Sequence, residues 1–367
     1  MPDLGAVVLC SGTATTRRIL GLTVGERVLL ALSFSGVRRV AFVGDGPRPE
    51  SSRADLTVVP LSDLNSDRIV LTTSDAVFDR RLIAAETIPS ALPLRVVSPT
   101  ELAAWLASPS LPTGSADSGT GFAIRATDDA AAKQAHKALL LSLRKPIDGW
   151  ISKHLNRHVS TFITQFLVLT GLSPNVFTVL FLGVGLLGAY LASLGEPWWA
   201  ILLAGVAFQA QSILDGCDGE IARLTYRFSK VGQWLDSIGD DVTNYAFCFG
   251  LAVGQAKVHN APWILWLGVV TAVVQWTATG VLYRRLIQLG TGDLLAIPDL
   301  TTGSGQGPVG TFIRGISKRD VFVFIIATLT AVQLPLVAFL VYSAGSFPTV
   351  FGVVLNDIRF GKQLAQK

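Results

Sequence analysis

Four aspartates, Asp215, Asp218, Asp236 and Asp240, lie in one short segment between two long apolar runs. Carboxylates at membrane depth are costly and are found mainly where they carry out chemistry or move ions. Residues three or four apart share one face of a helix, so Asp215 pairs with Asp218, and Asp236 with Asp240. Two helices joined by a short turn would bring these faces together. Such a cluster of carboxylate oxygens suits Mg²⁺, Mn²⁺ or Ca²⁺.

A divalent ion among these carboxylates favours a ligand that carries phosphate. Two ions about 4 Å apart can clamp a pyrophosphate and stabilise charge during in-line displacement. Arg223 could hold a phosphate oxygen with its guanidinium, and Gly219 and Gly232 permit close approach of the backbone. A carboxylate left over after metal binding could take a proton from an attacking hydroxyl.

The composition predicts a membrane protein with a soluble N-terminal part. Of the 367 residues, 50% are hydrophobic and only 15% are charged, whereas charged residues make up about a quarter of a soluble protein. The charge is concentrated in residues 1–158. We therefore expect a cytoplasmic domain over residues 1–140 and a membrane domain over residues 141–367. We expect no secretory signal, because the first thirty residues lack a basic start that leads into one apolar block. The three cysteines are far apart in sequence and are expected to be reduced. The net charge of only +4 predicts no nucleic-acid partner.

The N-terminal region alternates short apolar runs with helical patterning. Apolar runs at Leu4–Leu9, Val40–Val43 and Ile69–Leu71 are separated by patterns such as Glu26–Ser35. This alternation predicts an α/β domain with a parallel sheet. The Pro, Ser and Gly cluster over Ser108–Gly121 predicts a loop, and a helix is expected over Asp128–Leu143.

The C-terminal region predicts an all-α polytopic domain. Residues 144–158 mix basic and apolar side chains, as in an amphipathic helix on the membrane surface that leads into the first span. Six transmembrane helices then fit the roughly 20 apolar residues that a span requires. Their expected ranges are 175–194, 198–222, 233–254, 262–284, 320–335 and 336–356.

Basic residues near these spans predict the orientation. The opposite loops carry only Lys257, so the N-terminal domain, the aspartates and the C-terminus are expected on the cytoplasmic side of the cell (inner) membrane. The basic residues of the cytoplasmic side are Arg144, Lys145, Lys153, Arg157, Arg223, Arg227, Lys230, Arg284, Arg285, Arg314, Lys318, Arg319, Arg359 and Lys362. Arg314, Lys318 and Arg319 could also bind an acidic acceptor or lipid headgroups, and that alternative stays open.

A purely structural role and a transport role both account for the aspartates less well than catalysis does. A buried ion-pair network would leave them under-compensated, because only Arg223, Arg227 and Lys230 are near in sequence, and unpaired buried carboxylates cost several kcal/mol each. A cation-coupled transporter is the alternative from another class, but transporters are typically built from internal repeats, and the acidic cluster has no duplicate in the sequence.

The segment resembles the signature of the CDP-alcohol phosphotransferases (also named CDP-alcohol phosphatidyltransferases), D-x2-D-G-x2-A-R-x8-G-x3-D-x3-D, and matches every fixed position. Pro174, Asn175 and Thr178 also resemble the Pro-Asn-x-x-Thr element of that family, although Asn175 and Thr178 could equally be plain helix caps. The resemblance covers residues 144–356. It implies transfer of a phosphoalcohol group from a CDP-alcohol donor to an acceptor hydroxyl, with release of CMP.

The resemblance also implies roles for individual residues. Asp215, Asp218 and Asp236 would bind two Mg²⁺ or Mn²⁺ ions, and Asp240 would complete the metal site and act as the catalytic base. Glu220 and Asp241 lie off the motif face and are left out of the catalytic set. A homodimer is expected from the family alone. The nucleotide would contact Gly219, Ala222, Arg223, Gly232, Asn175 and Thr178.

The N-terminal domain resembles the sugar-phosphate nucleotidyltransferases, and its junction with the membrane part, at Lys145-Pro146 and Asn156-Arg157, resembles fusions that make CDP-inositol and then di-inositol phosphate phosphate. The Gly-rich loop would be Leu9–Arg18, with Asp75 as the metal-binding aspartate. Two departures from that pattern favour a degenerate domain. Val24-Gly25-Glu26-Arg27 replaces the usual Pro-Lys, which deprives the transferring phosphate of a cation, and Arg125 stands where a second metal aspartate is expected. Arg17, Arg18 and Asp75 are weak candidates for nucleotide contact.

The sequence leaves the acceptor open among an inositol phosphate, another polyol and a membrane lipid. It also leaves open a bifunctional enzyme whose N-terminal domain makes the CDP-alcohol from CTP.

Overall fold

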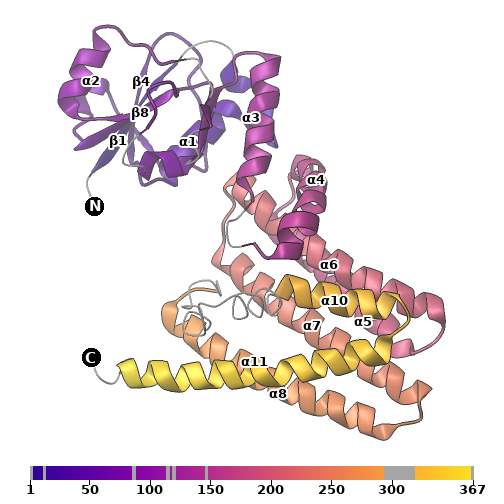
Figure 1. The fold of residues 1–367 in the computed structure, drawn as a ribbon. Coiled ribbons are helices and arrows are strands. Elements are labelled where there is room, and N and C mark those ends of the chain that lie inside the picture. The colour runs from indigo at the N-terminus through magenta and orange to yellow at the C-terminus, as the bar shows by residue number, and fades with distance from the viewer. Residues whose placement is uncertain are drawn as a thin grey trace. The chain divides into compact units, whose positions relative to one another are not determined.

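The chain folds into two compact units. The computed structural model describes residues 3–10, 14–84, 88–112, 116–117, 121–144, 148–292 and 319–364. One unit comprises residues 1–145 together with 165–171 and 223–226, and the other comprises residues 146–164, 172–222 and 227–367. Figure 1 shows both units and labels most of their helices and some of their strands.

The first unit contains a five-stranded mixed sheet. Its strand order is β5-β4-β1-β6-β8, and the strands are β1 (Leu4–Leu9), β4 (Arg39–Val43), β5 (Thr57–Val58), β6 (Arg68–Thr73) and β8 (Leu94–Val97). Strands β1, β4, β5 and β6 pair in parallel, as predicted, but β8 runs antiparallel to β6. The prediction of an entirely parallel sheet was therefore wrong at this edge. A parallel return requires a crossover of a dozen or more residues, usually a helix. The described part of the β6–β8 connection holds only β7 (Ala76–Phe78) and a 3-10 helix (Arg80–Ala84).

Short elements complete this unit. The predicted loop over Ser108–Gly121 contains one strand, β9 (Ala116–Asp117), which joins β10 (Phe122–Arg125) and β7 in an antiparallel sheet. A hairpin pairs β2 (Arg18–Ile19) with β3 (Leu22–Thr23). Further 3-10 helices lie at Ala14–Thr16 and Leu61–Asp63.

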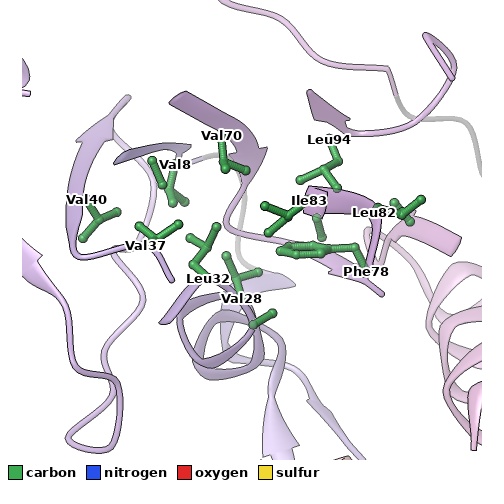
Figure 2. Packing of buried hydrophobic residues seen from close by; sticks show 14 of the residues in the cluster. Val8, Val28, Leu32, Val37, Val40, Val70, Phe78, Leu82, Ile83 and Leu94 are labelled. Carbon is green, nitrogen blue, oxygen red and sulfur yellow. The ribbon is translucent and has the colours of Figure 1, made fainter. Parts of the chain in front are cut away.

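Three helices flank these sheets, and each begins at a capping side chain. They are α1 (Val24–Ser33), α2 (Pro99–Leu106) and α3 (Asp129–Ser142). The side chains of Thr23, Ser98 and Asp128 each accept a hydrogen bond from a backbone N–H in the first turn, which satisfies a donor that the helix itself cannot. Figure 2 shows the core between α1 and the sheets, where Val28 and Leu32 face Val8, Val70 and Phe78.

The second unit is helical, and a helix lies at each of the six predicted spans. These helices are α5 (Pro174–Leu194), α6 (Trp198–Thr225), α7 (Lys230–Val258), α8 (Pro262–Leu289), α10 (Arg319–Ala331) and α11 (Pro335–Leu364). Among the described residues, four segments are long and apolar enough to cross a membrane, namely Pro174–Leu194, Trp198–Thr225, Pro262–Leu289 and Pro335–Val353. The chain is thus an integral membrane protein with four candidate spans, and the expected total of six is not established. Helix α7 carries several acidic residues, and α10 has only 13 described residues.

The predicted amphipathic helix is displaced towards the first span. A π-helix covers Ser152–Asn156, and α4 (Arg157–Leu167) continues from it, followed by a 3-10 helix (Val168–Thr170). Residues 145–147 of the predicted helix lie outside the described residues. The apolar side chains Phe162 and Phe166 are exposed on α4, whereas Ser160 and Thr164 are buried. The buried side of α4 is therefore its polar side, the opposite of a helix that packs through an apolar stripe.

Close contacts between backbones hold α5 against α7. A Cβ atom on Gly254 would lie 2.9 Å from the backbone nitrogen of Gly195 and still closer to the carbonyl oxygen of Ala192. Small residues at helix interfaces in membranes allow this approach. Phe208 of α6 stacks on Phe247 of α7 with ring centroids 4.0 Å apart. Helices α8 and α11 lie side by side (Figure 1).

We predict that Gly254→Leu destabilises the helical unit by about 1–3 kcal/mol or more, because the added side chain overlaps the backbone of α5. Gly183→Leu is the matched control, since a Cβ on Gly183 meets no atom within 4 Å. Thermal unfolding in detergent should show a lower midpoint for Gly254→Leu alone. Equal midpoints for the two variants would contradict the close packing of α5 on α7.

Candidate active site

The two halves of the aspartate motif lie at the sequence-adjacent ends of α6 and α7. Asp215 to Arg223 fall in the last turns of α6, and Gly232 to Asp240 in the first turns of α7. The hydroxyl of Ser229 caps α7 by accepting a hydrogen bond from the Gly232 N–H at 2.8 Å. The helix start is thereby fixed immediately before the second half of the motif.

Asp240 of α7 and Asp215 of α6 converge on one cation, Arg319 at the start of α10. The Arg319 guanidinium donates to both carboxylate oxygens of Asp240, and its Nη1 lies 4.0 Å from Oδ2 of Asp215. The sequence left the role of Arg319 open between positive charge at the membrane surface and ligand binding. Its two companions in that hypothesis, Arg314 and Lys318, lie outside the described residues.

Asp218 is held by a hydroxyl from α5. Its carboxylate is 5% exposed and accepts hydrogen bonds from Thr178 Oγ1 and the Gly219 N–H. Thr178 is not a plain cap, because α5 begins at Pro174 and its N-cap residue is Ser173.

Asn175, in the first turn of α5, meets the other half of the motif. A Cβ on Gly232 would lie 2.7 Å from Asn175 Oδ1, so a larger residue at this position would have to displace the Asn175 side chain. The first turn of α5 therefore contacts both halves of the motif. Ala222, Arg223 and Asp236 lie on α6 and α7 as part of the same motif.

The donor set suits a hard divalent ion. The four aspartates offer only oxygen ligands, which Mg²⁺ and Mn²⁺ prefer. The Arg319 guanidinium is a cation that pairs with the carboxylates of both Asp215 and Asp240. Among the described residues, no group of three or more His, Cys, Asp or Glu side chains is drawn together as a metal cluster. A cation is thus accommodated between two carboxylates, and the contributions of Asp218 and Asp236 to metal binding stay predictions.

Two acidic residues next to the motif have partners that the sequence did not reveal. Glu220 is fully buried and is bonded to Arg157, Ser160 and Thr164. Asp241 accepts a hydrogen bond at 2.7 Å from the Tyr283 hydroxyl of α8. Their positions off the motif face of the helices predict that neither is catalytic. Helical spacing indicates the face on which each side chain lies, but it does not identify the residues of other helices that bind there.

The N-terminal unit neutralises the aspartate that resembles a metal ligand. Asp75 is 1% exposed and accepts hydrogen bonds from Arg125, from Nε to Oδ1 at 2.9 Å and to Oδ2 at 3.2 Å, and from Nη2 to Oδ2 at 2.9 Å. Arg125 thus satisfies the carboxylate with a guanidinium fork. Of the weak candidates, Arg17 pairs with Asp129 at 2.6 Å and Arg18 is exposed. Residues 11–13 of the predicted Gly-rich loop lie outside the described residues.

Comparison with protein families identifies the helical part. Residues 171–350 match the family model described as CDP-alcohol phosphatidyltransferase. These residues form a CDP-alcohol phosphatidyltransferase domain. The match confirms the resemblance drawn from the aspartate motif and the transferase class that it implies. It includes both halves of the motif, the first turn of α5 and Arg319.

Relatives of this domain share part of their length with the chain. The "Bifunctional IPC transferase and DIPP synthase" of Aquifex aeolicus is 40% identical over 134 residues, 36% of this chain, and that of Thermococcus kodakarensis is 39% identical over 132 residues. These alignments span 30% and 29% of the two relatives. The "Archaetidylinositol phosphate synthase" of Pyrococcus horikoshii is 28% identical over 172 residues, which cover 47% of this chain and 78% of the relative. A solved structure of Mycobacterium tuberculosis phosphatidylinositol phosphate synthase with CDP-DAG bound has a TM-score of 0.39 and 18% identity, covering 55% of this chain and 91% of its own.

We predict that Arg125→Met destabilises the N-terminal unit by about 3–5 kcal/mol, because it leaves the buried Asp75 carboxylate without its cation. The double variant Asp75→Asn, Arg125→Met removes both charges and should recover most of that loss. Proteolysis of the full chain across a urea series measures the loss of stability in the single variant and its recovery in the double variant. A single variant as resistant as the unsubstituted chain would show that Asp75 does not depend on Arg125.

Proposed function

We propose that this chain transfers a phosphoalcohol group from a CDP-alcohol to an acceptor hydroxyl and releases CMP. The observation that carries the proposal is the convergence of Asp215 and Asp240, one from each half of the motif, on a single cation. The family of residues 171–350 supports the reaction class.

In the proposed reaction Asp240 takes the proton from the acceptor hydroxyl. The acceptor oxygen then attacks the phosphorus that carries the donor alcohol. A new P–O bond forms, the P–O bond of the pyrophosphate breaks, and its electron pair leaves with CMP. Asp215, Asp218, Asp236 and Asp240 would hold two Mg²⁺ or Mn²⁺ ions. Such ions, when bound, stabilise the charge of the pyrophosphate.

The nucleotide is proposed to lie along the motif and the start of α5. Gly219 and Gly232 would allow the nucleotide to approach the backbone closely, and Asn175 lies against Gly232. Arg223 would hold a phosphate oxygen, and Ala222 and Thr178 would complete the pocket. Thr178 also donates to Asp218, so it would orient a metal ligand in addition.

The acceptor is proposed to be an inositol phosphate or a related polyol. The names of the relatives, which include an archaetidylinositol phosphate synthase, support an inositol-containing product. Arg319 supports an acidic acceptor, because it is a cation beside Asp240, the proposed base. A lipid acceptor is the competing choice.

The wider arrangement is also proposed. Helices α7 and α10 would join the four candidate spans to make six, with the aspartates and the domain of residues 1–140 on the cytoplasmic side and two chains forming a dimer. The domain of residues 141–367 would then hold the transferase. The domain of residues 1–140 would be nucleotidyltransferase-like but degenerate, because Arg125 occupies the Asp75 carboxylate. A bifunctional enzyme is favoured only by the names of the relatives, and release of pyrophosphate from CTP by the purified chain would establish it.

We predict that the purified chain in detergent releases CMP from one of CDP-inositol, CDP-glycerol and CDP-diacylglycerol when Mg²⁺ and mixed acceptors are present. Asp240→Asn should lower the rate about 10²–10⁴-fold, the usual loss when a general base is removed. Asp241→Asn is the matched control, because Asp241 bonds to Tyr283 and is not assigned to the reaction. The donor that yields CMP also names the alcohol that is transferred.

CMP release that is equal in Asp240→Asn and the unsubstituted chain would contradict the assignment of the base. Folded protein that binds Mn²⁺ but yields no CMP from any of the three donors would contradict the proposed donor class. A transporter would take up its cation without producing CMP.

A further inference from the structure

Glu220 is a glutamate without solvent access in the middle of the aspartate motif. It is 0% exposed, and each of its carboxylate oxygens has a donor. Oε1 accepts from Arg157 Nη1 at 2.8 Å and from Ser160 Oγ at 2.7 Å, and Oε2 accepts from Thr164 Oγ1 at 2.7 Å. All three donors come from α4. A buried carboxylate that is paired and fully hydrogen-bonded is tolerated, and loss of one partner is costly.

Arg157 is equally well satisfied on its other side. Its Nε and Nη2 bond to the two oxygens of Asp148 at 3.0 and 3.1 Å. Burial lowers the pKa of Arg157, but the bonds and charges of Asp148 and Glu220 outweigh burial and leave the pKa above its ordinary value. The arginine is therefore a permanent cation that links the segment before α4 to α6.

The side of α6 that receives α4 is the side opposite the reactive aspartates. At 100° per residue, Gly216, Cys217 and Glu220 face roughly away from Asp215 and Asp218. A Cβ on Gly216 would lie 3.1 Å from Arg157 Nη1, and the Cys217 thiol donates to the Ser160 carbonyl at 3.5 Å. Because Glu220 accepts three bonds from one helix, it fixes the rotation of α6 about its own axis. That rotation decides where Asp215 and Asp218 point.

A second contact ties the same segment to Arg319. The backbone N–H of Ser152 donates to Asp320 Oδ2 at 2.7 Å. Gly149 also lies against the Asp320 carboxylate, where a Cβ would overlap its oxygens. Asp320 follows Arg319, whose guanidinium holds Asp240. Residues 148–164 thus contact α6 behind the motif and α10 beside Arg319.

We propose that Arg157 and Glu220 are positioning residues of the transferase. Together they set the rotation of α6 so that Asp215 and Asp218 present their oxygens to the divalent ions. The inference rests on the proposed function, but it concerns metal binding before any donor is present. It assigns α4 a role as the support of the metal site.

Two substitutions separate positioning from simple electrostatics. Glu220→Gln removes a negative charge near the site and Arg157→Gln removes a positive one. If only charge mattered, the first would weaken Mn²⁺ binding and the second would strengthen it. If the pair positions the aspartates, both weaken binding. Loss of a residue that orients metal ligands typically costs 10–100-fold in affinity or activity.

The experiment is calorimetric titration of the full chain in detergent with Mn²⁺ and no donor, with the thermal midpoint of each sample measured alongside. We expect at least about tenfold weaker Mn²⁺ binding for Glu220→Gln and for Arg157→Gln. The double variant should lose no more affinity than the weaker-binding single variant, because the two residues act as one unit. Tightening by Arg157→Gln, or unchanged affinity in both single variants, would overturn the proposal.

Thr164→Val guards against variants that do not fold. It removes one bond to Glu220 and keeps the shape of the side chain. Thr161→Val on the same helix is its control, since the Thr161 hydroxyl donates to backbone carbonyls of α4. Weaker Mn²⁺ binding in Thr164→Val alone supports the proposal, and equal affinity in both threonine variants contradicts it.

Failure of the proposed function is distinguishable from failure of this inference. An unsubstituted chain that binds Mn²⁺ but releases no CMP would contradict the proposed transferase activity. The Mn²⁺ titration of the variants would still decide whether Arg157 and Glu220 position the aspartates. A chain that binds no Mn²⁺ would overturn the metal site and this inference with it.

Discussion

A carboxylate between apolar helices must be given a cation or hydrogen-bond donors, because an unpaired buried charge costs several kcal/mol. The helical unit meets this requirement differently for each acid. Glu220 has an arginine and two hydroxyls from α4, Asp241 has a tyrosine and Asp218 has a threonine. Asp215 and Asp240 share the guanidinium of Arg319. Glu220 and Asp241, whose partners are fixed, stabilise the fold, and the pair that shares a cation is where another cation can bind.

The same constraint applies to the buried charged side chains of the N-terminal unit. An aspartate at the end of a buried strand can bind a metal only if its charge is available. Arg125 covers Asp75 with both of its forked donors, so the unit keeps an α/β sheet without an available carboxylate at that position. The buried Arg27 of α1 is likewise used structurally, since it donates to the carbonyls of Ile19, Leu20 and Leu224. The proposed chemistry lies in the helical unit.

Much of the fold could be predicted from periodicity. The apolar run Leu4–Leu9 is β1, and helices occupy all six of the predicted ranges in the second half. The antiparallel β8 could not be predicted, because strand direction depends on how the chain returns. The motif identified the aspartates through their spacing. The pairing of Arg157 with Glu220 joins residues 63 positions apart, and no periodicity within one helix specifies which residue of another helix it will meet. The positive charge of Arg319 can be read from the sequence, but its contact with Asp240 depends on how α10 packs.

The most direct test of the account is a crystal structure with Mn²⁺ and a CDP-alcohol, in which an anomalous difference map locates the metal. The account predicts two manganese peaks between α6 and α7, in contact with Asp215, Asp218, Asp236 and Asp240, and Arg319 moved off Asp240. A structure in which the nucleotide is bound but no peak lies among these aspartates would contradict it.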